Sequence, residues 1–302
     1  MSLIFDIKRY CINDGPGIRV TIFMKGCPLH CVWCHNPEGI ANHKEKLYTK
    51  KKCIGCQSCV EVCPQHALKL TRDGIVTDKS LCILCGKCVE ECPTLAMEMS
   101  GTEYSLDYLT EQMRKEIPVI EGSGGGVTFC GGEPLMHPEM LLALLDRAAG
   151  LGLHRAVDTT LFARPELVKQ VMSNCELFLV DLKLMDSEKH RFYCKVPNEL
   201  ILSNIRMVSE AGHPFFIRTP LIEGVNADEE NITKSADFLA SLPNPPEVIN
   251  LLPYHDIGKN KHEKLGTVYN PDNIPMSAPM EEWQRHCLDI FKDRGLNAEI
   301  GG

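Results

Sequence analysis

Cysteine spacing is the sequence feature that most restricts how this chain can fold. Eleven of its sixteen cysteines lie in three short runs, and two of these runs repeat the pattern C-x2-C-x2-C-x3-C-P. The first run contains Cys53, Cys56, Cys59 and Cys63, and the second, 29 residues later, contains Cys82, Cys85, Cys88 and Cys92. Bacterial ferredoxins bind two [4Fe–4S] clusters with this pattern, and the fourth cysteine of each run binds the other cluster. The repeat therefore predicts a small lobe folded around two clusters.

Crossed ligation divides the eight cysteines into two sets. One cluster takes Cys53, Cys56, Cys59 and Cys92, and the other takes Cys82, Cys85, Cys88 and Cys63. Because both clusters would be fully ligated, we expect them to carry electrons and not to bind substrate. Residues 47–100 have little else to bury, so we predict a ferredoxin-like insert there, carried by a domain formed from residues 1–46 and 101–302. A pair of zinc sites is the alternative.

The third run differs because it supplies only three thiolates. Cys27, Cys31 and Cys34 lie in GCPLHCVWCHNPE, and three cysteines leave one iron of a [4Fe–4S] cluster open to a small molecule. Closed metal sites are mostly structural, whereas an open position supports chemistry. We therefore predict a catalytic cluster on this loop. A zinc knuckle is the alternative interpretation.

Composition excludes several classes of function. The formal charge of −8 argues against a general nucleic-acid binder, which normally carries a basic surplus. No apolar run is long enough to span a membrane, and the first residues, MSLIFDIKRYC, lack the features of a signal peptide. We therefore expect a cytoplasmic protein whose cysteines are metal ligands and not disulfides. The five cysteines outside the runs are expected to be small buried hydrophobes: Cys11, Cys130, Cys175, Cys194 and Cys287.

Outside the insert, aliphatic and β-branched segments alternate with helical patterns. Strands are expected at 18–24, 127–129, 155–157, 177–180, 215–217 and 248–252. Helices are expected at 104–116, 138–149, 165–172, 200–211, 228–242 and 280–294. Strict alternation predicts a parallel sheet with helices outside it. The sheet is either an open doubly wound form or part of a barrel.

Polar residues follow these strands at the points where they end. They are Gly131, Gly132, Glu133, Asp158, Thr159, Asp181, Lys183, Arg218 and His255. Parallel sheets and barrels place their sites at this edge. Lys183 and Arg218 suit a carboxylate, the two glycines allow a ligand amino group to approach, and Trp33 offers an aromatic face to adenine. Taken singly, each has an ordinary alternative, such as core packing for Trp33.

A glycine-rich stretch, GSGGGVTF at residues 122–129, invites comparison with a phosphate-binding loop. It lacks the Gly-Lys-Ser/Thr ending that places a lysine and magnesium on phosphates, and it precedes a strand instead of opening a helix. We therefore reject a nucleotide triphosphatase.

Together with the twin runs, GCPLHCVWCHNPE and VTFCGGEPL make the chain resemble the radical S-adenosylmethionine (SAM) enzymes. More narrowly, it resembles glycyl radical enzyme activating enzymes of the pyruvate formate-lyase activating type that carry a two-cluster insert. This likeness rests on INDGPGIRVTIFMKGCPLHCVWCHNPE, DTTLF, LVDLKLMD, FFIRTPLIEGVN and LLPYHDIGKNK, in that order. It implies a partial (β/α)6, TIM-like barrel. It also implies reductive cleavage of S-adenosylmethionine to a 5′-deoxyadenosyl radical, which removes a hydrogen from a glycine of a partner glycyl radical enzyme.

The resemblance also implies roles for individual residues. Cys27, Cys31 and Cys34 hold the catalytic cluster, while Trp33, Cys34 and His35 contact the nucleoside. Other cofactor contacts are expected from Gly131, Gly132, Asp181, Lys183, Arg218 and His255. A monovalent cation is expected at Asp158, Thr159 and Asp181. The partner's glycine loop is expected to contact Asp14, Gly15 and Gly17.

One residue departs from the pattern, because Cys130 stands where relatives often have serine. We expect it to be a packed thiol and not a fourth ligand. Reduced flavodoxin or ferredoxin is the expected electron donor to the insert. Two alternatives remain open: a radical SAM enzyme acting on another peptide or small metabolite, and a ferredoxin-type electron carrier. A carrier with two clusters holds about eight irons, whereas a radical SAM activase with the insert needs about twelve.

Overall fold

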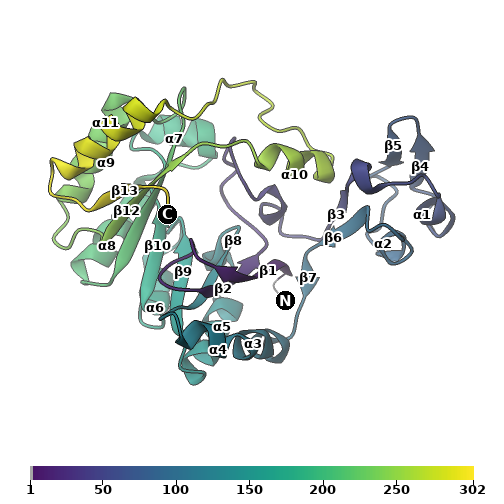
Figure 1. Cartoon of the computed structure of the whole chain (residues 1–302), viewed down its shortest axis with the longest axis horizontal. Coiled ribbons are helices and arrows are strands. Elements are labelled where there is room, and N and C mark those ends of the chain that lie inside the picture. Colours follow the sequence, from purple (N-terminus) through teal and green to yellow (C-terminus); the bar gives the residue numbers. More distant parts are fainter. Residues whose placement is uncertain (1–2) are drawn as a thin grey trace.

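The computed structural model describes residues 3–302 and contains one large sheet (Figure 1). Within the described residues the sheet has nine strands in the order β13-β12-β11-β10-β9-β8-β2-β1-β7. Their bounds are β1 (Leu3–Cys11), β2 (Arg19–Met24), β7 (Thr102–Glu103), β8 (Gly126–Gly131), β9 (His154–Thr159), β10 (Leu177–Asp181), β11 (Phe215–Leu221), β12 (Val248–Pro253) and β13 (Ala298–Ile300).

Strand direction agrees with the α/β expectation for most of the sheet. All neighbouring pairs from β2 to β13 are parallel, and the six expected strands are β2 and β8–β12. The sequence did not reveal the two ends of the sheet. At one end β1 runs antiparallel to β2 and β7, and at the other β13 adds a parallel strand beside β12.

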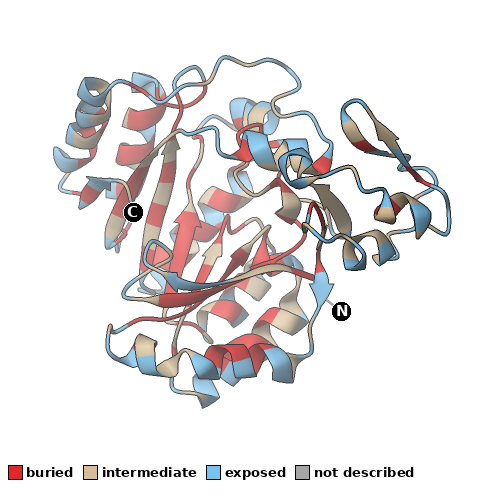
Figure 2. Ribbon diagram, turned by 45° about the vertical axis from the view of Figure 1, so that its right-hand side comes forward, coloured by how far each residue is buried: buried red, intermediate tan, exposed pale blue. Residues whose placement is uncertain are grey.

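Helices cover the sheet, and their buried faces form the main core with the strands (Figure 2). They are α3 (Leu106–Lys115), α4 (Ile117–Glu121), α5 (Pro138–Gly150), α6 (Pro165–Met172), α7 (Ser187–Cys194), α8 (Glu199–Glu210), α9 (Glu229–Ala240), α10 (Gly258–Leu265) and α11 (Glu281–Lys292). Every residue of β2 is buried, as expected for a strand packed on both faces of the sheet. Helices α4, α7 and α10 were not predicted.

The segment between β2 and β7 contains a smaller lobe beside the sheet (Figure 1). Its base is the antiparallel pair β3 (Glu45–Tyr48) and β6 (Met97–Ser100), and its outer part contains the hairpin β4 (Leu68–Thr71) and β5 (Gly74–Thr77). Two short helices, α1 (Ser58–Glu61) and α2 (Lys87–Glu90), carry cysteines. The lobe has its own small core, which includes Leu68, Ile75 and Met97.

A buried lysine joins this lobe to the large sheet. Lys25, directly after β2, is fully buried, and its Nζ donates to the carbonyl of Glu38 and, at 2.8 Å, to the carboxylate of Glu45. Glu45 is paired with Ser100 at the base of the lobe. One cation therefore fixes the start of the lobe against the loop that follows β2.

We expect Lys25→Met to loosen the base of the lobe. Methionine keeps the apolar stem but removes the cation that Glu45 and the Glu38 carbonyl share, which costs about 2–4 kcal/mol for hydrogen bonds to a charged group in a buried setting. Hydrogen exchange of the β3–β6 amides measures the effect. The control is Lys50→Met, which removes an exposed pair with Asp73 and is expected to cost less than about 1 kcal/mol. Equal protection in both variants would contradict the assignment.

Helix α10 forms a second connection between the lobe and the large domain. Lys79 of the lobe donates to the carbonyls of Leu265 and Gly266, both at 3.2 Å, where α10 ends. Lys261 of the same helix donates to Asn36 and pairs with Glu38 on the loop after β2, each at 2.7 Å. The helix thus contacts both the lobe and the cysteine loop.

Candidate active site

A cavity of about 480 Å³ lies at the carboxyl ends of the parallel strands. Its lining includes the residues predicted to bind the catalytic cluster, the cofactor or the cation: Cys27, Cys31, Trp33, Cys34, His35, Gly131, Gly132, Asp158, Thr159, Asp181, Lys183, Arg218 and His255. The residues expected to receive the partner's glycine loop, Asp14, Gly15 and Gly17, are not among the lining, although the neighbouring Asn13 is. The structure therefore brings together residues that are far apart in the sequence.

The three-cysteine loop is held by its backbone. Cys27 N donates to Ile40 O at 3.0 Å at the start of the loop, and Val32 N donates to Tyr193 O at 3.1 Å in its middle. Burial raises the pKa of the Cys27 thiol, and it raises the pKa of Cys34 to about 12. Thiolates at these positions therefore need a cation beside them, which iron would supply.

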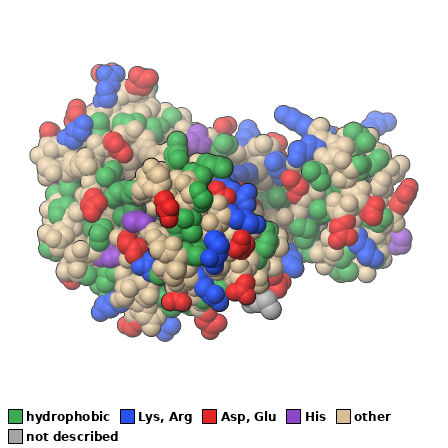
Figure 3. Space-filling model, turned by 60° about the horizontal axis from the view of Figure 1, so that its bottom comes forward, with side chains coloured by type: hydrophobic (Ala, Val, Ile, Leu, Met, Phe, Trp, Pro, Cys, Tyr) green, Lys and Arg blue, Asp and Glu red, His purple; other side chains and the backbone are tan. Residues whose placement is uncertain are grey.

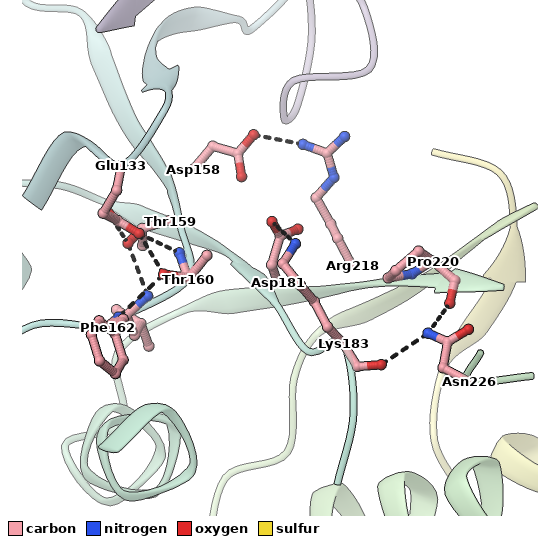
Figure 4. Close-up of polar contacts among 11 residues, drawn as sticks. Glu133, Asp158, Thr159, Thr160, Phe162, Asp181, Lys183, Arg218, Pro220 and Asn226 are labelled. Atoms are coloured by element: carbon pink, nitrogen blue, oxygen red, sulfur yellow. Dashed lines mark hydrogen bonds and ion pairs between the residues drawn. The ribbon is translucent and has the colours of Figure 1, made fainter. Parts of the chain in front are cut away.

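Two ion pairs form the polar floor of the cavity (Figure 4). Arg218 on β11 lies 2.7 Å from Asp158 on β9, and Lys183 lies 2.7 Å from Asp181 at the end of β10. Burial raises the pKa of Asp158 to about 6, even though Arg218 opposes the shift. Burial disfavours the charged form of Lys183, but Asp181, Cys31 and Cys194 together outweigh it and raise the pKa of the ammonium. Both bases remain charged at neutral pH.

These pairs bear on the predicted cation site. Its two carboxylates, Asp158 and Asp181, each hold a basic partner, and the Thr159 hydroxyl donates to Glu133 at 2.6 Å. A monovalent cation would have to displace Arg218 or Lys183 from these oxygens. The cation therefore stays a prediction.

Glu133 organises the neighbouring strand end, a role that the sequence did not indicate (Figure 4). Its fully buried carboxylate accepts hydrogen bonds from the hydroxyls of Thr159 and Thr160, both at 2.6 Å, and from the Thr160 and Leu135 amides. Burial raises the pKa of this carboxyl, and these four donors oppose the shift. The only sequence feature that could have indicated this role is the position of the acidic residue directly after Gly131 and Gly132.

Asn226 holds a second strand end and was also missed. Its side-chain amide donates to Lys183 O at 2.8 Å and to Pro220 O at 2.7 Å, and its Oδ1 accepts from Ile222 N (Figure 4). It fixes the backbone of Lys183 relative to the end of β11. A fully buried asparagine in a loop is hard to distinguish, by sequence, from an ordinary turn residue.

Aromatic rings form another wall of the cavity. The rings of His35 and His255 stack with centroids 4.0 Å apart. Burial, with the neighbouring His255, lowers the pKa of His35 to about 4, so the ring is neutral at physiological pH. Its Nε2 is buried and has no hydrogen-bond partner among residues 3–302, which a ligand in the cavity would correct. Trp33 also lines the cavity, but only 4% of it is exposed, and it packs beside Leu29 and Val32.

The glycine pair at the end of β8, Gly131 and Gly132, has a packing function that the sequence did not reveal. A methyl group on Gly132 would overlap the carbonyl oxygens of Gly26 and Gly39, which flank the cysteine loop. Gly132 N donates to Met24 O at 2.7 Å, so three backbones meet here. Cys130, just before the pair, is buried and lines the cavity, as a packed thiol would.

The glycine-rich stretch before β8 packs against the Asp14–Gly17 loop. A Cβ on Gly17 would lie 2.5 Å from Gly125 N, and one on Gly125 would overlap Ile18 O. Fully buried Arg19 donates to Pro16 O at 2.9 Å, and Asp14 accepts from Thr21 at 2.6 Å. The glycines of this stretch are therefore explained by close packing of two backbones, which leaves no room for side chains.

Two further cavities lie in the smaller lobe. One, here called the outer cavity, is lined by Cys53, Cys56, Cys59 and Cys92. The other, the inner cavity, is lined by Cys63, Cys82, Cys85 and Cys88. Each thus collects three cysteines of one run and the fourth of the other.

The cysteines of the chain are all free, and their arrangement bears on the kind of metal group that they could hold. All sixteen cysteines are free thiols, and four of the five outside the runs are buried, whereas Cys11 is half-buried. Among residues 3–302, no group of three His, Cys, Asp or Glu side chains is arranged to hold one metal ion. A zinc ion needs four ligands around one centre, whereas a [4Fe–4S] cluster bonds each thiolate to its own iron.

Within residues 3–302, no helix is long and apolar enough to cross a bilayer.

Comparison with known proteins identifies the class to which this chain belongs. A family model described as the radical SAM superfamily matches residues 21–236. The chain is 40% identical over 303 residues to the trans-4-hydroxy-L-proline dehydratase activating enzyme of Clostridioides difficile, covering 99% of each. It is 39% identical to the choline trimethylamine-lyase activating enzyme of Oleidesulfovibrio alaskensis, covering 91% of this chain and 90% of that protein.

A solved structure adds a similar match. A domain of a pyruvate-formate lyase-activating enzyme from Bacteroides vulgatus is 59% identical, with a TM-score of 0.52, and covers 59% of this chain and 100% of that one. The chain is therefore a radical SAM oxidoreductase. Within that superfamily, the chain belongs to the glycyl radical enzyme activating enzymes, which cleave S-adenosylmethionine reductively and remove a hydrogen from a glycine of a partner enzyme.

Proposed function

We propose that the cavity at the sheet edge binds the catalytic [4Fe–4S] cluster through Cys27, Cys31 and Cys34, with S-adenosylmethionine beside it. The single observation that carries this proposal is that three free cysteines and the strand-end polar residues line one cavity. When bound, the cluster and S-adenosylmethionine supply one-electron cleavage of the sulfonium bond and the resulting hydrogen abstraction. The protein's own residues bind, orient and shield these groups.

Specific residues suit specific parts of S-adenosylmethionine. Arg218 and Lys183 offer their positive charges to its carboxylate, at the cost of weakening their pairs with Asp158 and Asp181. Gly132 allows the backbone to lie near its amino group. The unpartnered Nε2 of His35 suits a polar atom of the nucleoside, and the stacked His255 ring keeps it in place. Glu133 and Asn226 position the strand ends that carry these groups.

We also propose that the smaller lobe holds two auxiliary [4Fe–4S] clusters in a ferredoxin-like domain, at residues 47–100. The ligand sets expected from crossed ligation match the linings of the outer and inner cavities, which supports the assignment. The antiparallel base begins two residues earlier, at Glu45. Residues 1–46 and 101–302 would then form the radical SAM domain. An open sheet that curves beside the cavity supports a partial (β/α)6 barrel (Figure 1).

The anaerobically reconstituted protein tests these proposals. We expect about twelve irons per chain, three [4Fe–4S] signals, and formation of 5′-deoxyadenosine from S-adenosylmethionine on reduction. With candidate glycyl radical enzymes added, an organic radical should appear by electron paramagnetic resonance. About four irons would contradict the auxiliary clusters. About eight irons without S-adenosylmethionine cleavage would indicate an electron carrier, and cleavage without a protein radical would favour another peptide or a small metabolite as substrate.

A further inference from the structure

We propose that a small acidic one-electron carrier protein of the flavodoxin type docks on the outer end of the smaller lobe, over the outer cavity. The inference rests on the proposed auxiliary clusters and names the surface at which electrons arrive. It follows from the order of the two cavities along the lobe and from the lysines of one surface, because exposed apolar side chains lie at both ends, Ile54 at the outer cavity and Ile83 at the inner one.

The ladder between β3 and β6 sets the order of the cavities. It starts at the large domain with Glu45 opposite Ser100 and runs outward to Tyr48 opposite Met97. Lys46 and Met99, the next pair after Glu45 and Ser100, line the inner cavity, while Tyr48 and Met97 line the outer one.

Two further observations agree with this order. Cys82, from the inner set, also lines a groove of about 500 Å³ together with Leu265 and Gly266 at the end of α10. In Figure 1, α1, which carries Cys59 of the outer set, lies farther from the sheet than α2. A carrier that delivers electrons through both clusters in turn would therefore meet the outer one first.

The surface over the outer cavity combines apolar side chains with lysines. Ile54 and Leu95 are 69% and 61% exposed, and three consecutive exposed lysines, Lys50–Lys52, directly precede Cys53. These residues form one patch, because Lys52 Nζ lies 3.5 Å from Leu95 O, and Ile54 and Thr94 line the same cavity. We call Lys50, Lys51, Lys52, Ile54 and Leu95 the outer patch.

Charge distinguishes the two ends of the lobe. The outer patch has three lysines, whose pairs with Asp73 at 3.3 Å and Glu98 at 3.8 Å join exposed side chains and are weak. Beside the inner cavity, Lys46 and Lys87 line the pocket, and Glu90 and Glu91 lie at the end of α2 and directly after it, so positive and negative side chains balance there. Figure 3 shows basic side chains gathered along the upper edge of this lobe.

This arrangement suits a transient electron-transfer complex. Such interfaces are small, and complementary charge steers the partner and accelerates association more than it strengthens binding. Exposed Ile54 and Leu95 would supply the apolar centre, and the lysines would attract carboxylates at the edge. Cys56, a predicted ligand of the outer cluster, is itself exposed beside them, so the carrier's cofactor would approach the cluster closely.

The test compares two charge reversals in the iron-loaded full chain, with flavodoxin as the probe. Lys51→Glu combined with Lys52→Glu is expected to weaken flavodoxin binding at least about tenfold at low salt, and to slow flavodoxin-driven bleaching of the clusters by a similar factor. The matched control is Lys87→Glu on α2, expected to change binding by less than about twofold. Raising the salt to about 0.5 M should weaken wild-type binding and remove most of the difference.

Each other outcome overturns the inference. If Lys87→Glu weakens binding more than the double variant, the carrier docks over the inner cavity. If neither variant changes binding, it docks elsewhere. Bleaching by dithionite checks that the clusters are intact, and Lys51→Ala with Lys52→Ala replaces the double variant if that protein loses iron. If the wild-type protein holds about four irons, the proposal of auxiliary clusters is wrong. If it holds about twelve irons but flavodoxin binding does not depend on Lys51 and Lys52, only the proposed docking surface is wrong.

Discussion

Cys31→Ala is expected to abolish formation of 5′-deoxyadenosine and to lower the iron content from about twelve to about eight per chain. Cys31 lies in the middle of the loop whose other two thiols line the same cavity, and two thiolates cannot hold a cluster that already has one open iron. The matched control is Cys287→Ala, a fully buried thiol in α11 that belongs to none of the three runs. It is expected to keep full iron content and activity.

A second cysteine variant distinguishes ligands of the catalytic cluster from ligands of the auxiliary clusters. Cys53→Ala removes a thiol from the lining of the outer cavity and leaves the catalytic loop unchanged. We expect it to slow reduction by a protein carrier while S-adenosylmethionine binding, measured by calorimetry, stays within about twofold of wild type. If Cys31→Ala still produced 5′-deoxyadenosine, the assignment of the catalytic cluster would be wrong.

Gly132→Ala is expected to weaken S-adenosylmethionine binding by about ten- to a hundredfold. The added methyl would overlap the carbonyl oxygens of Gly26 and Gly39, so the cysteine loop must move away from β8. Overpacking of this kind costs about 1–3 kcal/mol, which equals about fivefold to about 150-fold in affinity, and the expected loss lies within that range. Calorimetric titration of the iron-loaded variant with S-adenosylmethionine measures the loss.

Gly150→Ala provides the control for this variant. Gly150 lies at the end of α5 with no atom within 4 Å of its potential Cβ, and alanine favours helix there. We expect unchanged S-adenosylmethionine binding and a slightly higher melting temperature. Wild-type affinity in Gly132→Ala would mean that the backbones at this point separate without disturbing the site.

The central architecture was predictable because it depends on local patterns. Aliphatic and β-branched segments identify strands such as β2 and β10, which are buried on both faces of the sheet. The polar residues at the strand ends were predictable for a similar reason, since parallel strands bring their carboxyl ends to one edge.

Partnerships between distant side chains were not predictable. Arg218 reaches Asp158 across the intervening strand β10, which depends on the register of three strands. The buried roles of Glu133 and Asn226 depend on loops that return to neighbouring strand ends. Edge strands β1, β7 and β13 were missed because β7 and β13 are very short and β1 has an exposed, irregular outer half. The contact between Gly17 and Gly125 involves no side chains, so composition alone could not reveal it.

Helix α10 makes the two domains interdependent. Its last carbonyls accept from Lys79, and Lys261 fastens the segment around Asn36 and Glu38. Deleting residues 47–100 would remove the Lys79 hydrogen bonds from the end of α10. The segment beside the predicted catalytic cysteines would then be held less firmly. Activity lost in such a shortened protein would therefore not measure the contribution of the proposed auxiliary clusters alone, because the catalytic site would be disturbed as well.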